Sequence, residues 1–213
     1  MPRTEEVNQQ IREQRRVRIL EGAAVIFARK GLVATKIADI ADATDMSQGL
    51  IYRYFAGKDE LFAVLVEQGM ASVGDLALQA RARPGSAWER LRWFTVQMAP
   101  HQYQQPAYSL VVAHALTSEA VPTAVRDLTR RRLDALREVL TEIIVEGQAS
   151  GQVAAGHPTQ LALLYLAALH GLAALAAFIE QPADGFPDVE SVLRILAPHA
   201  GRSGVESRGG STR

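Results

Sequence analysis

Residues able to hydrogen-bond to nucleic acid lie close together between positions 47 and 54, where the chain reads SQGLIYRY. The polar and aromatic members of this stretch are Ser47, Gln48, Tyr52, Arg53 and Tyr54. They fall on the outer side of a short predicted helix, whose apolar residues face inward. A helix start that carries such side chains outward is the arrangement by which a helix-turn-helix places side chains in the major groove of DNA.

The elements that position these residues are two short helices joined by a tight turn, predicted between Thr35 and Leu61. Thr35 and Ser47 are each placed to cap a helix start, where a side-chain oxygen accepts a backbone N–H. An earlier helix, from about Val17 to a stop at Gly31, would buttress the pair. Apolar residues at helical spacing mark the inward faces of the two short helices. They are Ile37, Ile40, Ala41, Ile51 and Phe55.

This region resembles the N-terminal signature of TetR-family transcriptional regulators. That signature runs A-x-x-L-F-x-x-x-G, then T-x-x-x-x-I-A, then A-G-V-S-x-G-x-L-Y-x-H-F-x-x-K-x-x-L. The matching residues are Ala24, Phe27, Gly31, Thr35, Ile40, Ala41, Ser47, Gly49, Tyr52, Phe55, Lys58 and Leu61. The chain departs from it at Thr44 and Asp45 in place of Ala-Gly, at Met46 in place of Val, and at Tyr54 in place of His. Aspartate tolerates a left-handed turn, so the turn is still expected to form.

The resemblance implies that ten residues of this region contact DNA. Gln48 and Arg53 are expected at base edges and Leu50 at a thymine methyl group, by the usual pairing geometry. Gly49 would let the helix backbone come close to DNA. The other six are expected to hold phosphates. They are Thr35, Lys36, Ser47, Tyr52, Tyr54 and Lys58. For the two tyrosines, packing in the core with the hydroxyl at the rim is the alternative.

Composition limits the class of protein and the type of site. The 213 residues include no cysteine, which excludes a disulfide scaffold and a thiolate metal site and fits a reducing cytoplasm. No serine-hydrolase, zinc-protease or phosphate-loop motif occurs, so we expect neither an enzyme nor a metal or other cofactor. The net charge is zero, so attraction to phosphate must come from local placement. Arg12, Arg15, Arg16 and Arg18 supply a local cluster, for which a solvated helix face is an equal alternative.

The sequence predicts an all-α fold of about nine helices, because no alternating strand pattern occurs. We expect a helix-turn-helix DNA-binding domain with an N-terminal arm over 1–60. A larger helical effector-binding and dimerisation domain follows over 61–199, and a disordered tail covers 200–213. After the helix-turn-helix, helices are expected at 58–80, 86–98, 106–118, 125–150, 161–179 and 189–197. The N-terminus lacks the apolar core of a signal peptide.

The segment 161–179 carries no formal charge over nineteen residues, which is long enough to span a membrane. A buried core helix is the favoured interpretation, so no membrane partner is expected. A helix apolar on every side needs cover on every side, and a second copy of the chain is the economical cover. The resemblance also implies a dimer through two C-terminal helices. The expected interface residues are Leu161, Ala168, Gly171, Leu172, Leu175, Val192 and Leu196.

The remaining chain is larger than DNA docking requires, and the resemblance implies that it encloses an effector pocket. The aromatic, methionine and histidine residues chosen to line it are Trp93, Phe94, Met98, Tyr103, Tyr108, His114, Tyr165 and His170. Because no acidic cluster accompanies them, we expect a ligand that is largely apolar and neutral or anionic. The predicted function is a cytoplasmic repressor that binds palindromic operator DNA as a homodimer and is released by a small-molecule effector. The alternatives are a helical protein-interaction adaptor and an effector-independent activator.

Overall fold

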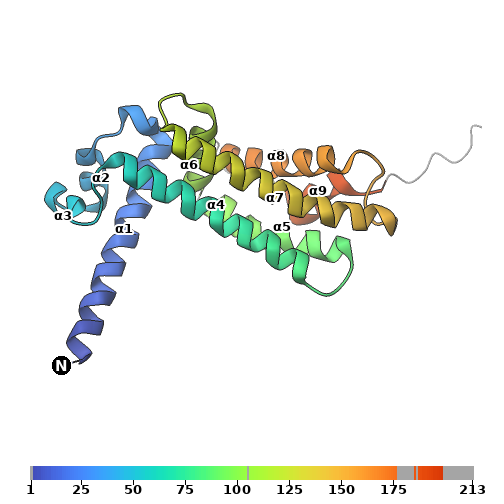
Figure 1. Cartoon of the computed structure of the whole chain (residues 1–213), viewed down its shortest axis with the longest axis horizontal. Helices are drawn as coiled ribbons and strands as arrows, with labels where there is room; N and C mark the ends of the chain where they lie inside the picture. The colour runs from blue at the N-terminus through green and yellow to red at the C-terminus, as the bar shows by residue number, and fades with distance from the viewer. Residues whose placement is uncertain (1, 105, 177–184, 186, 199–213) are drawn as a thin grey trace, which may run out of the picture.

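The computed structural model describes residues 2–104, 106–176, 185 and 187–198. This part of the chain is entirely helical, which confirms the predicted all-α fold (Figure 1). Its elements are α1 (Pro2–Ala34), α2 (Ile37–Thr44), α3 (Gln48–Tyr52), α4 (Lys58–Ala82), α5 (Ala87–Gln104), α6 (Pro106–Thr117), α7 (Thr123–Ala149), α8 (Pro158–Ala176), α9 (Val189–Leu193) and the 3₁₀ helix η1 (Arg194–Leu196).

Helix α1 begins fifteen residues earlier than the sequence predicted, at Pro2 instead of Val17. Its first turns are rich in Glu, Gln and Arg, which are good helix formers although they give no apolar stripe to detect. Figure 1 shows this part of α1 projecting from the body beside α2 and α3. At the other end, Gly31 adopts φ 69° and kinks the helix before α2, in a conformation that favours glycine.

The turn between α2 and α3 forms as predicted, with Asp45 in the left-handed region at φ 54°. Ser47 caps α3, because its side chain accepts the Leu50 backbone N–H at 3.2 Å. The predicted cap at Thr35 is wrong: Lys36 occupies the N-cap position of α2, and the Lys36 backbone N–H donates to the Asp39 carboxylate at 2.9 Å. A hydrogen bond from Lys30 lowers the pKa of the Asp39 carboxyl, which therefore stays ionised.

Two hydrophobic clusters form the core. The first joins α1, α2 and α3 to the start of α4 and to α6, and includes Phe27 and Phe62 packed edge to face at 5.2 Å. The second joins the end of α4 to α5, α7, α8 and α9. Helix α4 therefore runs without interruption from one cluster into the other, across the domain boundary predicted after position 60.

In the larger part of the fold, a capping box lies at the start of α5. The Ser86 backbone N–H donates to the Glu89 carboxylate at 2.8 Å, and the Glu89 N–H donates to the Ser86 hydroxyl at 3.2 Å. Helix α5 continues through Pro100 to Gln104, further than the predicted end at Met98. The expected tail, 200–213, and the last part of the expected 161–179 helix lie outside the described residues.

Helices α4 and α8 are long and apolar enough to cross a membrane by length and composition alone. Both contribute buried side chains to the core, including Leu65 and Val66 from α4 and Tyr165 and Leu169 from α8. Because these side chains pack in the protein core, no bilayer is needed to explain why one side of each helix is apolar.

The residue that Gly22 of α1 faces on α2 leaves no room for a side chain at position 22. A Cβ atom at position 22 would lie 2.3 Å from the Thr44 Cγ2 atom, and Thr44 is buried with its hydroxyl donating to the Ile40 carbonyl at 2.8 Å. Thr44 is the residue that departs from Ala in the family signature. The larger side chain at position 44 therefore requires the smallest residue at position 22.

We expect Gly22→Ala to lower the free energy of unfolding by about 1–3 kcal/mol, the range for overpacking a core. Replacing Thr44 by Ala in the same chain should restore most of this loss, because it removes the clashing methyl group. Urea titration of the two single variants and the double variant measures the coupling. A double variant no more stable than Gly22→Ala would contradict the assignment.

Candidate DNA-binding surface and effector cavity

The outer face of α3 presents the predicted base-reading side chains to solvent. Ile51 is fully buried in the first cluster and fixes the orientation of this one-and-a-half-turn helix. Gln48, Gly49 and Arg53 are exposed, and Tyr52 is 55% exposed. Each of these residues can therefore reach a ligand without rearrangement of the core.

The remaining members of the predicted set around α3 differ in exposure. Ser47 is exposed but uses its hydroxyl oxygen to cap α3. Leu50 is half-buried, and Tyr54 is half-buried with its ring packed against the first cluster. For Tyr54 the structure thus places the ring in the alternative, packed position, while Tyr52 stands outward.

Thr35 and Lys58 are engaged within the protein. Thr35 is fully buried, and its hydroxyl donates to the Gly31 carbonyl at 2.7 Å. The Lys58 Nζ donates to the carbonyls of Leu32, Val33 and Thr35, each at 3.0 Å. An ammonium group has three donors, so all of them are used at the end of α1. Thr35 and Lys58 therefore help to position α3 through their hydrogen bonds at the end of α1. The expectation that their side chains hold phosphate is not met in this arrangement.

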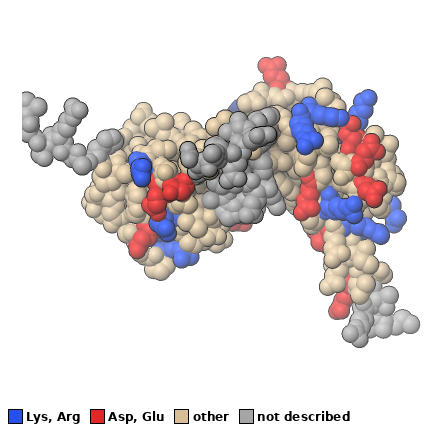
Figure 2. Space-filling model, turned by 180° about the vertical axis from the view of Figure 1, so that it is seen from behind, with Lys and Arg blue, Asp and Glu red and all other residues tan. Residues whose placement is uncertain are grey.

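Basic side chains around α3 are few and partly neutralised. Residues 1–60 contain ten basic and nine acidic residues. Figure 2 shows both signs at the end of the molecule from which α1 projects, without a continuous basic surface. Arg16 stacks on Phe55 with its Cζ 5.5 Å from the ring centroid, and Lys30 pairs with Asp39 at 2.8 Å. Lys36, Arg12, Arg15 and Arg18 are exposed without an ion pair among the described residues.

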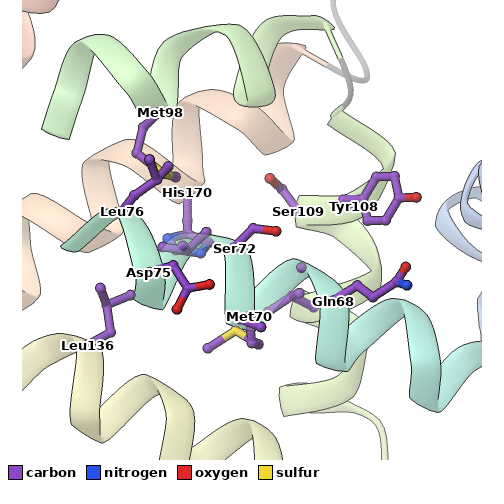
Figure 3. Close-up of a pocket in the computed structure, with 14 residues that line it drawn as sticks. Gln68, Met70, Ser72, Asp75, Leu76, Met98, Tyr108, Ser109, Leu136 and His170 are labelled. Carbon is purple, nitrogen blue, oxygen red and sulfur yellow. The ribbon is translucent and has the colours of Figure 1, made fainter. Parts of the chain in front are cut away.

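A partly open cavity of about 490 Å³ lies where α4 passes between the two clusters (Figure 3). One wall is α4 from Gln68 to Leu76, and the other comes from α6 through Tyr108, Ser109 and Val112. The volume is in the range of small-molecule sites. Burial, with a smaller effect of the Glu21 carboxylate, raises the pKa of Tyr108, so its phenol is protonated at neutral pH.

The cavity includes three of the eight residues predicted to line an effector site. These are Met98, Tyr108 and His170. Phe94 and Tyr165 lie in the second cluster, both fully buried, and the Tyr165 hydroxyl shares a 2.6 Å hydrogen bond with Thr95. Their aromatic character reflects core packing.

Trp93 and His114 also lie away from this cavity. Trp93 is covered by Arg83, whose Cζ lies 4.6 Å from the ring centroid. A Cβ atom at Gly31 would lie 3.9 Å from the His114 ring, so His114 adjoins the kink of α1. Tyr103 lies outside the residues whose side chains are described. The polar residues Gln68, Ser72 and Asp75 of α4 were missed, although their i, i+4, i+7 spacing placed them on one helix face.

The residues predicted to form the dimer interface differ in how exposed they are. Val192 and Leu196 are buried in the second cluster of their own subunit, so their prediction as interface residues is wrong. On α8, Gly171 is exposed and Leu175 is 51% exposed, while Leu161, Ala168 and Leu172 are half-buried. The same face carries Leu163 and Leu164, which are 56% and 58% exposed. Leu164 was detectable, because it precedes Ala168, Gly171 and Leu175 at spacings of four, three and four.

Comparison with known proteins identifies the N-terminal region. The family model described as bacterial regulatory proteins, tetR family, matches residues 19–65. The HTH-type transcriptional regulator YfiR of Bacillus subtilis strain 168 is 29% identical over 109 residues, 46% of this chain and 53% of that protein. The match thus spans about half the length of the Bacillus relative. The HTH-type transcriptional repressor KstR2 of Mycobacterium tuberculosis is 29% identical over 137 residues, 62% of this chain and 68% of that protein.

Most of the fold has a solved counterpart in AibR, whose structure was determined in complex with isovaleryl coenzyme A and operator DNA. The two chains superpose with a TM-score of 0.62 at 21% identity, over 83% of this chain and 92% of AibR. This likeness concerns the fold. The family match covers residues 19–65, which include the outward face of α3, so this region is similar to bacterial regulatory proteins of the tetR family.

Proposed function

We propose that the protein is a repressor that binds a palindromic operator as a homodimer and leaves it when a small, largely apolar effector binds. The observation that carries the proposal is the outer face of α3, where Gln48, Tyr52 and Arg53 are exposed on a helix anchored by buried Ile51. Gln48 and Arg53 are the candidates for base edges, by their side-chain geometry. A DNA target implies a cytoplasmic location.

A single copy of α3 is too short to bind one operator selectively. Its five residues reach few base pairs, and a genome offers a large excess of competing sites. Two copies at a fixed spacing read two half-sites. The exposed face of α8, with Leu163, Leu164, Gly171 and Leu175, supports a second copy as the partner because it would otherwise leave large apolar side chains in water.

Two helices connect the cavity with the DNA-binding surface. Helix α4 forms one wall of the cavity and begins at Lys58, which holds the end of α1. Helix α6 forms the opposite wall and buries Val111 and Ala115 in the first cluster, against α1. A ligand that separates these walls would shift α1 and α3 together. KstR2 is a repressor by description, and AibR was solved with both a ligand and operator DNA, which supports the proposal by analogy.

The base-reading role of Gln48 is tested by comparing Gln48→Ala with Lys36→Ala. Gln48→Ala should relax the preference at particular base pairs, by about 1–3 kcal/mol for each lost bidentate contact. Lys36→Ala should instead weaken binding to all sequences and lower the salt slope by about one phosphate contact. Operators selected from random DNA, followed by titration at several salt concentrations, give both quantities. A uniform loss for Gln48→Ala would remove it from the base-reading set.

The internal role of Lys58 predicts a loss of stability. Lys58→Met should lower the free energy of unfolding by about 1.5–3 kcal/mol, as expected for hydrogen bonds to a charged group, because three carbonyls lose their donor. Lys36→Met is the matched control, since the Lys36 ammonium makes no hydrogen bond or ion pair in the described part of the chain and interacts with Asp39 only at longer range. Urea unfolding measures both. Unchanged stability with weakened DNA binding would instead favour direct phosphate contact by Lys58.

The role of α8 in dimerisation is tested by Leu164→Glu, which places a charge in the centre of the proposed interface. We expect a monomer, because an unpaired buried carboxylate opposes association. Leu78→Glu on α4 is the matched control, as Leu78 is a similarly exposed leucine away from this face. Analytical ultracentrifugation reports the mass of each variant. A Leu164→Glu variant that remains dimeric would exclude this face.

A further inference from the structure

The cavity has an unbalanced set of charged groups. Asp75 is the only acidic residue among its described lining residues, and none of these is Lys or Arg. No hydrogen bond or ion pair within the described part of the chain engages the Asp75 carboxylate. Several carboxylates elsewhere in the C-terminal body have an arginine partner, as in the pairs Arg81–Glu142 and Arg92–Glu190. Asp75 therefore lines the cavity as a solvent-exposed carboxylate without a Lys or Arg side chain beside it.

His170 adds a second acceptor at the same end of the cavity. Its Nδ1 lies 3.0 Å from the Leu166 carbonyl oxygen. A carbonyl can only accept, so Nδ1 carries the hydrogen, and in the neutral imidazole Nε2 is then an acceptor. Figure 3 shows Asp75 and His170 towards one end of the cavity, while Gln68 and Tyr108 lie towards the other. A ligand that satisfies both Asp75 and His170 must supply hydrogen-bond donors there.

The rest of the lining is suited to an apolar chain. Leu76, Met98 and Leu136 surround the end with Asp75, and Met70 and Val112 continue the apolar surface along the cavity. Methionine side chains adapt to ligands of irregular shape. An anionic ligand whose charge lies at the end of the cavity with Asp75 would place that charge near a carboxylate or in apolar surroundings, and both are unfavourable.

We propose that the effector cavity takes an amphipathic molecule with a positively charged nitrogen, bound by the Asp75 carboxylate and the His170 imidazole, with its apolar part along α4 and α6. This inference rests on the proposed effector function and names its ligand class. It revises the sequence-based expectation of a neutral or anionic ligand. An acyl coenzyme A would not fit this lining, because its phosphates need basic partners and none of the described lining residues is Lys or Arg.

Three probes with the same ten-carbon chain test the charge preference: decylamine, decanol and decanoate, each below its micelle concentration. Calorimetric titration of the full chain should show decylamine binding about five- to tenfold more tightly than decanoate, the range expected for one partly exposed charge in an apolar wall. Asp75→Asn should remove this preference and leave decanol binding unchanged. Asp75→Lys should reverse it in favour of decanoate. Glu138→Gln, which removes an exposed carboxylate from α7, is the matched control and should behave as the parent protein.

The outcomes distinguish the ligand class from the effector function. Equal or tighter binding of decanoate by the parent protein, no binding of any probe, or a decylamine preference that survives in Asp75→Asn would each overturn the inference. A separate DNA titration with saturating decylamine then tests the effector function. Binding that depends on Asp75 but leaves DNA affinity unchanged would support the ligand class and refute the effector role of the cavity.

Discussion

The three hydrogen bonds of the Lys58 ammonium are the interaction on which the placement of the DNA-binding surface depends. They join the first residue of α4 to the carbonyls of Leu32, Val33 and Thr35, where α1 ends. Carbonyls at a helix end have no partner within the helix, and a cation there also interacts favourably with the helix dipole. Since α1 packs on α2, and α2 positions α3, the orientation of the reading helix relative to α4 is set at this point.

The same helix would carry the proposed effect of the cavity to the DNA-binding surface. Helix α4 belongs to the first cluster up to Met70 and to the second from Ala77, and the cavity lies along the turns between them. Packed clusters resist deformation, whereas this intermediate segment has a partly open side. Beside this segment, an added Cβ at Gly69 would lie 3.5 Å from Val112, an ordinary contact distance, so α6 lies directly against α4 here. In the proposed mechanism, a bound ligand would therefore act by moving α4 relative to α6.

Much of the fold could be predicted from local sequence patterns, and the missing parts depend on tertiary partners. The cap at Ser47 and the turn at Asp45 are short-range features, and both were correctly predicted. The inward orientation of Val192 was not, because which face of a short helix is buried depends on the elements that it meets. Likewise, Thr35 and Lys58 matched a signature, but only the structure shows that they bond to the end of α1. The cavity was only partly predicted, because aromatic residues on helices are more often core, as Phe94 and Tyr165 are.

The balanced charge of the chain makes the spacing of two reading helices more important than electrostatic attraction. Residues 1–60 carry nearly equal numbers of basic and acidic residues, and Lys30, one of the basic residues, is held by Asp39. In the proposed dimer, few phosphate contacts would make each half-site bind weakly and with a shallow salt dependence. Affinity would then come mainly from linking two weak contacts, which can add a factor of about 10²–10⁴ when the geometry fits and nothing when it does not. Under this proposal, a small change in the angle between α4 and α6 would release the dimer, and strong charge attraction would make the same switch less effective.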